Sequence, residues 1–227
     1  MSGSGLFTRQ HAAKAHLLVG SGGVAAEVAD LRNDMLAELS TMAAMAVDEY
    51  TNPVAAAAAG LEAATATTVA PRTVLAAGLL APGKAALLAY GRNVTFTTAG
   101  ATPADAPATA LVTGTGMDGL PLTETVTLAQ TATIANGVKA FKTIVSVAYA
   151  AADGTAATVS IGFGVSLGLG RKPKARAGLA APIQEIAVGV LVTTGVISDT
   201  NRTYTPAAAP DGVKDYAVYY EYDAAVA

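Results

Sequence analysis

Two stretches decide the fold: Leu122-Thr123-Glu124-Thr125-Val126-Thr127-Leu128 and Phe141-Lys142-Thr143-Ile144-Val145-Ser146-Val147. In each of them, threonine and β-branched residues recur with a period of two, which is the usual pattern of an antiparallel strand. Tight-turn dipeptides lie close by, at Asp118-Gly119, Asn136-Gly137 and Asp153-Gly154. This spacing predicts a mainly β protein whose body, over residues 90–170, is an antiparallel β-sandwich or barrel-like structure.

The chain before this body is expected to form an extended arm and one helix. Residues 1–23 contain Ser-Gly repeats, a composition typical of a flexible arm. Over residues 24–53, apolar side chains recur every three or four positions and predict an amphipathic helix; they are Val28, Leu31, Met35, Leu39, Met42 and Met45. Thr51-Asn52-Pro53 is expected to end this helix at Tyr50, because the residue before a proline is displaced from helical geometry.

Two further segments complete the predicted organisation. Residues 54–89 form an alanine- and threonine-rich connection, in which Ala55 to Ala59 before Gly60 are compatible with a short helix. Residues 171–227 begin with a basic segment and continue with strands that are expected to pack on the core. The last strand is predicted at Ala217-Val218-Tyr219-Tyr220-Glu221-Tyr222, which is rich in aromatic and β-branched residues.

The composition favours a chain whose surface is covered by other subunits. Hydrophobic residues make up 52% of the 227 residues and charged residues only 14%, against roughly 25% in an average globular domain. The net charge of −3 argues against sequence-independent nucleic-acid binding. The apolar run from Leu79 to Tyr90 is interrupted by Pro82, Gly83 and Lys84, so we expect no membrane span there.

The candidate catalytic and binding motifs all have plainer interpretations. Gly114-Thr115-Gly116-Met117-Asp118-Gly119 matches the glycine pattern of dinucleotide-binding proteins, but a threonine-rich strand follows it where that site needs a helix, so we predict a hairpin turn. The chain has no cysteine, and its two histidines, His11 and His16, lie in the expected arm. We therefore expect no enzyme, no cofactor and no metal site.

The residues expected to act are contact residues. They belong to the arm, the apolar stripe of the helix and the one basic cluster, and are Leu17, Leu18, Val28, Leu31, Met35, Leu39, Met42, Arg171, Lys172, Lys174 and Arg176. With only four charges, the basic cluster favours a salt-dependent contact with an acidic patch of a partner over a contact with nucleic acid.

Several motifs, in this order, resemble a known class of protein. They are Arg92-Asn93-Val94-Thr95-Phe96-Thr97, Val112-Thr113-Gly114-Thr115, Leu122-Thr123-Glu124-Thr125, Lys139-Ala140-Phe141-Lys142-Thr143-Ile144 and Val159-Ser160-Ile161-Gly162-Phe163-Gly164. Together with the tyrosine-rich end, they resemble structural proteins of tailed-bacteriophage virions, over about residue 30 to the C-terminus. One departure is the position of Asp118, which the pattern places directly after the Gly114-Thr115 pair.

Within that class, the chain resembles head decoration, or cement, proteins. The resemblance implies a subunit on the surface of the phage head, made in the host cytoplasm, that binds the lattice of the major capsid protein and reinforces it. It also implies binding to copies of itself, with a trimer preferred, and no membrane or specific nucleic-acid partner. Two alternatives remain open: a tail-tube, neck or head–tail adaptor subunit, and a carbohydrate-binding module for host adsorption, which the absence of tryptophan disfavours.

Overall fold

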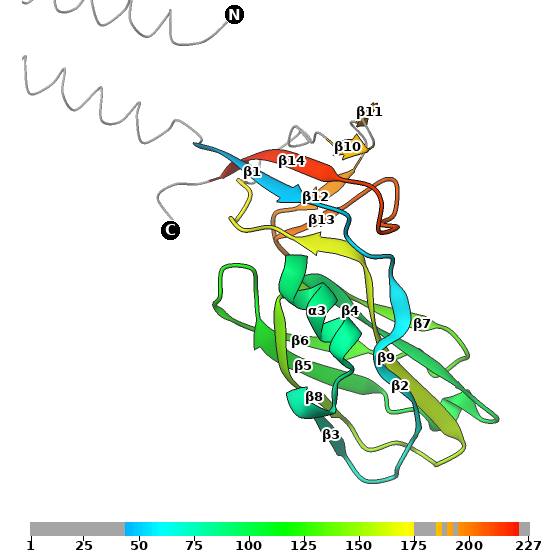
Figure 1. The fold of residues 1–227 in the computed structure, drawn as a ribbon. Helices are drawn as coiled ribbons and strands as arrows, with labels where there is room; N and C mark the ends of the chain where they lie inside the picture. The colour runs from blue at the N-terminus through cyan, green and yellow to red at the C-terminus, as the bar shows by residue number, and fades with distance from the viewer. Residues whose placement is uncertain (1–43, 175–184, 188–189, 193–194, 223–227) are drawn as a thin grey trace, which may run out of the picture. The chain divides into compact units, whose positions relative to one another are not determined.

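The computed structural model describes residues 44–174, 185–187, 190–192 and 195–222, and this part of the chain is mainly β, as predicted (Figure 1). One α-helix, α3 (Ala81–Tyr90), and two short 3₁₀ turns, η1 (Ala76–Gly78) and η2 (Pro103–Asp105), interrupt the strands. The strands are β1 (Ala44–Tyr50), β2 (Ala57–Ala66), β3 (Arg72–Leu75), β4 (Arg92–Gly100), β5 (Thr109–Thr115), β6 (Pro121–Thr127), β7 (Ile134–Phe141), β8 (Thr143–Tyr149), β9 (Ala157–Gly168), β10 (Glu185–Ala187), β11 (Val190–Val192), β12 (Val196–Ser198), β13 (Thr203–Thr205) and β14 (Tyr216–Tyr222).

Two antiparallel sheets form the body. One has the strand order β3-β8-β5-β6, and the other has the order β12-β13-β9-β4-β7, with β2 also paired to β9. Strand β9 is the longest, and it pairs with β4 on one side and with β2 and then β13 on the other. Consecutive strands β5 and β6 form a hairpin, whereas the chain changes sheet between β7 and β8.

The main core lies between these two sheets. Val112 and Val147 contribute to it from one sheet, and Phe96 and Ile161 contribute from the other. All four residues are fully buried. The ring of Phe96 meets that of Tyr149 edge-on at 6.0 Å between centroids, so the aromatic contact also joins the sheets. Alternating inward side chains from both layers are what the period-two pattern of the sequence predicts.

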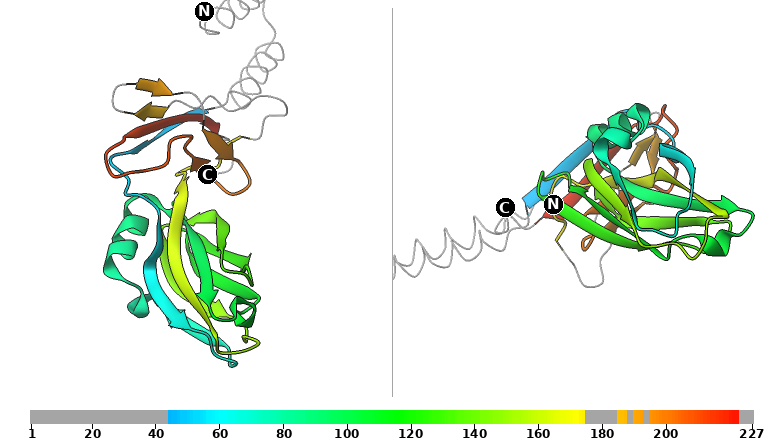
Figure 2. Two further views of the ribbon diagram at one scale, coloured as in Figure 1. Left: turned by 90° about the vertical axis from the view of Figure 1, so that its right-hand side faces the viewer. Right: turned by 90° about the horizontal axis from the view of Figure 1, so that it is seen from below.

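Helix α3 packs beside β2 at one end of this core (Figure 2). Its first turn contains Pro82, which is tolerated because N–H groups in the first turn have no carbonyl partner within the helix. Gly91 ends it with a φ of 62°, a left-handed conformation that favours glycine. Leu87 is buried in the core, while Leu88 is 54% exposed, so the helix covers the sheets with one side only.

Glu124 connects the two sheets at their β6–β7 edge. It lies on the inner side of β6, is 8% exposed, and accepts hydrogen bonds from the main-chain N–H groups of Val138 (2.7 Å) and Lys139 (3.2 Å). The side chain of Lys139 donates in return to the carbonyl of Thr123 at 2.9 Å. The carboxylate thus satisfies main-chain donors on the side of β7 that β4 does not pair.

A second, tyrosine-rich core lies at the C-terminal end of β9. Tyr50 of β1 and Tyr220 of β14 pack there with Leu167 and Leu169, together with Tyr204, Tyr216 and Val218. The Tyr50 hydroxyl donates to the carbonyl of Gly168 at 2.8 Å. Strands β1 and β14 pair with each other, and β10 and β11 form a short antiparallel hairpin.

Several sequence predictions were wrong in detail. The helix expected to run to Tyr50 does not do so, because residues from Ala44 to Tyr50 form β1 and pair with β14. The short helix with which Ala55 to Ala59 are compatible does not form: β2 begins at Ala57, and the segment around it supplies β2, β3 and α3 to the body. Residues 1–43, with the expected arm and most of the expected helix, lie outside the described residues.

The dipeptide Asn136-Gly137 is not a turn but part of β7. A Cβ atom on Gly137 would lie 2.8 Å from Oε2 of Glu124 and 2.9 Å from the carbonyl oxygen of Val94, so the glycine serves close packing there. The expected strand from Phe141 to Val147 is divided at Lys142, where the chain passes from β7 to β8.

The predicted hairpin at Gly116 to Gly119 is confirmed. Strand β5 ends at Thr115 and β6 begins at Pro121, with Gly116 N–H donating to the carbonyl of Leu120 at 3.0 Å. Gly119 has a φ of 76°, and β6 begins two residues later, with no helix between them. The final strand was also predicted correctly, at β14.

Candidate interaction surfaces

The outer side of the β3-β8-β5-β6 sheet forms a surface that we call the threonine face. The strand register aligns its side chains in rows: Thr73, Ala148, Leu111 and Thr125 in one, and Leu75, Ser146, Thr113 and Thr123 in the next. The remaining members are Thr109, Thr115, Pro121, Thr127, Thr143 and Val145. Residues between these positions, such as Val112 and Val147, point into the core, which is why the face follows the period of two.

No member of the threonine face carries a charge. Its exposed apolar side chains are Leu75 (61% exposed), Leu111 (42%) and Val145 (57%). A β-bulge in β8 turns Val145 outward in addition to Ser146, which increases the apolar share of the face. A neutral sheet face of hydroxyl and aliphatic groups can be removed from water without desolvating an ion, so it is suited to a protein contact.

The basic segment lies against β14. The Arg171 N–H donates to the Tyr220 hydroxyl at 2.9 Å, and the Lys174 N–H donates to the carbonyl of Glu221 at 2.8 Å. Between these two points, Pro173 forms a bridge to Tyr222, and the Arg171 guanidinium lies 5.5 Å from the centre of the Tyr222 ring. These contacts fix the main chain of the segment, while the side chains of Arg171 and Lys172 remain exposed.

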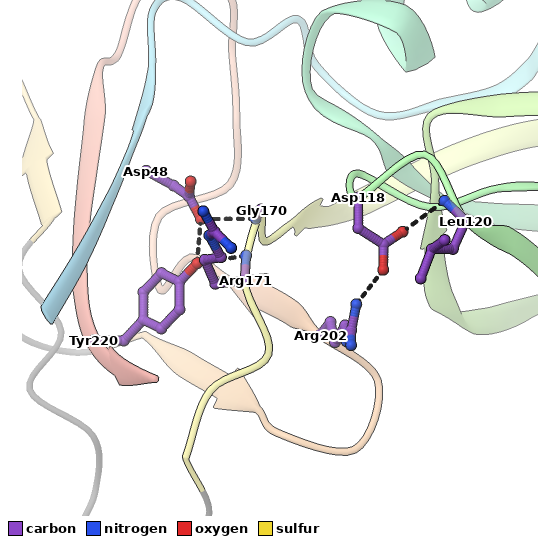
Figure 3. Close-up of polar contacts among 7 residues, drawn as sticks. All are labelled: Asp48, Asp118, Leu120, Gly170, Arg171, Arg202 and Tyr220. Atoms are coloured by element: carbon purple, nitrogen blue, oxygen red, sulfur yellow. Dashed lines mark hydrogen bonds and ion pairs between the residues drawn. The ribbon is translucent and has the colours of Figure 1, made fainter. Parts of the chain in front are cut away.

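Asp48 holds this arrangement together (Figure 3). Its Oδ2 accepts hydrogen bonds from the Tyr220 hydroxyl at 2.7 Å and from the Gly170 N–H at 2.9 Å. Burial raises the pKa of Tyr220 above its ordinary value, and its hydrogen bond to the Asp48 carboxylate raises the pKa further. Three distant parts of the sequence therefore meet at one carboxylate: β1, the end of β9 and β14.

A second polar contact joins two turns. Arg202, in the turn between β12 and β13, forms an ion pair with Asp118 in the β5–β6 turn (Figure 3). The other oxygen of Asp118 accepts a hydrogen bond from the Leu120 N–H at 3.0 Å. Asp118 is thus the turn residue that the sequence predicts, and it has an additional partner 84 positions away.

Arg92 is a buried cation whose partners are main-chain carbonyl groups. It is 1% exposed and donates to the carbonyls of Gly164 and of Val54, the latter at 2.8 Å. Its guanidinium carbon lies 5.1 Å from the centre of the Phe163 ring. Burial lowers the pKa of Arg92 to about 10. These contacts connect the segment before β2 to β9, so we assign Arg92 a structural role.

Most of the contact residues predicted from the sequence cannot be compared with this geometry. Leu17, Leu18, Val28, Leu31, Met35, Leu39, Met42 and Arg176 lie outside the described residues. Arg171, Lys172 and Lys174 are placed together, at the surface beside β14. The threonine face was missed as a surface, although the alternating threonines of 122–128 are its sequence signal.

Metal sites and membrane-spanning helices were sought in the described part of the chain. Within residues 44–222, excluding the segments that the structure leaves undescribed, no three histidine, cysteine, aspartate or glutamate side chains gather as a potential metal site. No helix in the same ranges is both long and apolar enough to cross a membrane.

Comparison with protein-family models, with curated proteins and with solved structures finds no match for this chain.

Proposed function

We propose that this chain is a structural subunit of a tailed-bacteriophage virion, a decoration protein that binds the capsid lattice and stabilises the head. The proposal assigns it no reaction and no cofactor. Its support is the sequence resemblance together with surfaces suited to contacts between proteins. The N-terminal arm and helix of the sequence prediction would reach neighbouring subunits, and copies of the chain would associate, with a trimer as the preferred form.

The observation that carries the proposal is the neutral threonine face. Three of its strands have seven residues and β3 has four. With strands about 4.8 Å apart and about 3.4 Å per residue, the face presents roughly 400 Å². A specific interface of standard size buries about 800 Å² on each partner. The threonine face therefore supplies about half of such an interface, which suits a subunit that is held by several neighbours at once.

The basic segment is a suitable second contact. The exposed side chains of Arg171 and Lys172 stand on a main chain that is fixed to β14, so less entropy is lost on binding than from a free loop. Their charges would steer the subunit to an acidic patch of the major capsid protein, and the steering would weaken at high salt.

A tail-tube, neck or adaptor subunit is the second candidate, and strand β2 favours it. Within the described part of the chain, this strand pairs only with β9, and many of its exposed side chains are alanines, such as Ala58, Ala59 and Ala63. The Leu80 N–H donates to the carbonyl of Leu61 at 2.8 Å, beside α3, so the part of the edge beyond Leu61 is the part open to pairing. A weakly charged edge strand can pair there with a strand of the next subunit in a ring.

Imaging of virus particles made with and without the protein tests the proposal. The decoration hypothesis predicts density at regular positions on the head, and heads that lose DNA at a lower temperature when the protein is missing. Density confined to the tail or neck would instead establish the second candidate. If heads without the protein withstand heat and osmotic shock as well as complete heads do, the decoration proposal is wrong.

A further inference from the structure

A cleft of about 600 Å³ lies on the side of the β9-β4-β7 layer that faces away from the main core. Asn93 and Thr95 of β4, Asn136 of β7, Ser166 of β9 and Thr203 of β13 contribute to it. This volume is within the range of ~300–1,000 Å³ that pockets for small ligands occupy.

The cleft is electrically neutral. None of its lining residues carries a charge, and its polar members are asparagine, serine and threonine. A phosphate, carboxylate or ammonium group would lose its hydration there and gain no counter-charge, so ionic ligands are disfavoured.

The main chain beneath the cleft is already hydrogen-bonded. The side-chain amide of Asn93 donates to the carbonyl of Gly137 at 3.0 Å, and its oxygen accepts from the Ser166 N–H at 3.0 Å. The carbonyl of Gly164 accepts from the Arg92 side chain. An extended peptide binds a sheet by pairing with such main-chain groups, and here they are occupied. A ligand in the cleft would therefore bind to side chains and not to main-chain groups, and the hydrogen bonds beneath the cleft hold these side chains in place.

Deep hydroxyl groups remain available. Thr95 and Thr203 are each 4% exposed, and within the described residues neither hydroxyl has a hydrogen-bond partner. Ser166 and Thr205 share one hydrogen bond of 2.8 Å between their hydroxyls, which leaves one of the two protons for a ligand. An apolar ligand would bury these groups unpaired, which opposes its binding.

From this combination we propose that the cleft binds a neutral oligosaccharide. Sugar hydroxyls donate and accept at once, as the threonine, serine and asparagine groups of the cleft do. The carbon skeleton of the sugar would lie against the exposed apolar side chains of the lining, Ile134 (48% exposed) and Val138 (55%). This activity is separate from the structural role proposed above and does not depend on it.

The test uses the ¹⁵N-labelled full-length chain and records its amide spectrum with added sugars. The probes are maltotriose, cellotriose, mannotriose and the trimer of N-acetylglucosamine, each up to about 20 mM, a concentration that nearly saturates a site with a Kd of about 1 mM. Sialyllactose and inorganic phosphate are the charged controls, and a synthetic peptide of residues 1–23 tests a peptide occupant. We expect at least one neutral trisaccharide to shift cleft amides and the charged probes to leave them unchanged.

Substitutions then identify the site. Thr95→Val and Thr203→Val remove one hydroxyl each and keep the side-chain shape, and each is expected to weaken binding about tenfold. Thr97→Val is the matched control, since Thr97 lies on the same strand and its buried hydroxyl does not line the cleft. Three results would overturn the proposal. The first is that no neutral probe shifts the cleft amides; the second is that Thr95→Val and Thr203→Val bind the sugar as strongly as Thr97→Val does. The third is that the peptide alone shifts the cleft amides.

Discussion

Replacing Glu124 by alanine is the sharpest test of how the two sheets are joined. The carboxylate is 8% exposed and accepts hydrogen bonds from the N–H groups of Val138 and Lys139. Glu124→Ala removes both bonds and leaves two main-chain donors at a closed edge of the sandwich. Glu124→Gln keeps one acceptor oxygen but directs its own N–H₂ group toward one of the two donors.

The expected cost follows from these two bonds. A hydrogen bond to a charged group contributes about 1.5–3 kcal/mol, so the loss of both bonds in Glu124→Ala should lower the free energy of unfolding by about 3–6 kcal/mol. With a urea m-value of about 2 kcal/mol/M, the unfolding midpoint should fall by about 2 M. Glu124→Gln should lie between this variant and the wild type. Thr125→Ala, at the next and exposed position, should change the stability by less than about 0.5 kcal/mol.

Urea unfolding can be followed by tyrosine fluorescence, which is undisturbed because the chain contains no tryptophan. Hydrogen exchange supplies the local measurement: the amides of Val138 and Lys139 should exchange faster in Glu124→Ala, and by a larger factor than the loss of global stability explains. If Glu124→Ala unfolds within about 1 kcal/mol of Thr125→Ala, the bridging role of the carboxylate is refuted.

Three further predictions concern other contacts. Gly162→Ala places a methyl group against the β2 main chain and should cost at least about 1–3 kcal/mol in urea unfolding; an unchanged midpoint would contradict the packing described. Asp48→Ala should cost about 2–4 kcal/mol, and in a double-mutant cycle with Tyr220→Phe the two effects should not add; additive losses would show that the two side chains act independently. Burial raises the pKa of Tyr50 and Tyr220 above 10, so their contribution to stability is complete below pH 10 and is lost as the pH rises through the folded-state values. Burial raises the pKa of Tyr149 in the same way. Arg92, with its pKa lowered to about 10, acts in the opposite direction but is one group against three. Absorbance at alkaline pH should therefore show late, cooperative tyrosine ionisation, and a smooth titration near pH 10 would count against it.

The strands that could be predicted from the sequence are those with a local signal. Leu122 to Leu128 alternates strictly, and β6 occupies Pro121–Thr127. Asp118-Gly119 is a turn because aspartate and glycine suit that backbone wherever the rest of the chain lies. In both places, local preference and tertiary structure agree.

The errors occur where distant residues decide. The alanines of 55–59 suit either a helix or a strand, and pairing with β9, a hundred positions later, determines the outcome. The residues of β1 fit the helical spacing, yet they pair with β14 near the other end of the chain. Gly137 resembles a turn residue, but it is required by the closeness of Glu124 and Val94.

The surfaces could be predicted only in part. Alternating threonines in β5 and β6 indicate a polar strand face, but the neutrality of the whole threonine face depends on the register of four strands. The cleft is harder still to predict from the sequence, because Thr95 and Thr203 come from separate halves of the chain. Thr95 lies in the motif Arg92 to Thr97, but neither that motif nor the sequence around Thr203 indicates a binding site.

We propose that the neutral threonine face is a contact surface of the assembly, and the affinity of charged variants for heads can decide this. Leu111→Lys places a charge in the middle of the face, where burial of an unpaired ion at the interface should cost about 3 kcal/mol, or about a hundredfold in affinity. Val213→Lys is the control, since Val213 is 68% exposed and lies outside the face. Both variants should unfold within about 0.5 kcal/mol of the wild type, because both positions are at the surface. Titrated onto heads that lack the protein, Val213→Lys should bind as the wild type does and Leu111→Lys should bind about a hundredfold more weakly; equal occupancy by all three would contradict the account.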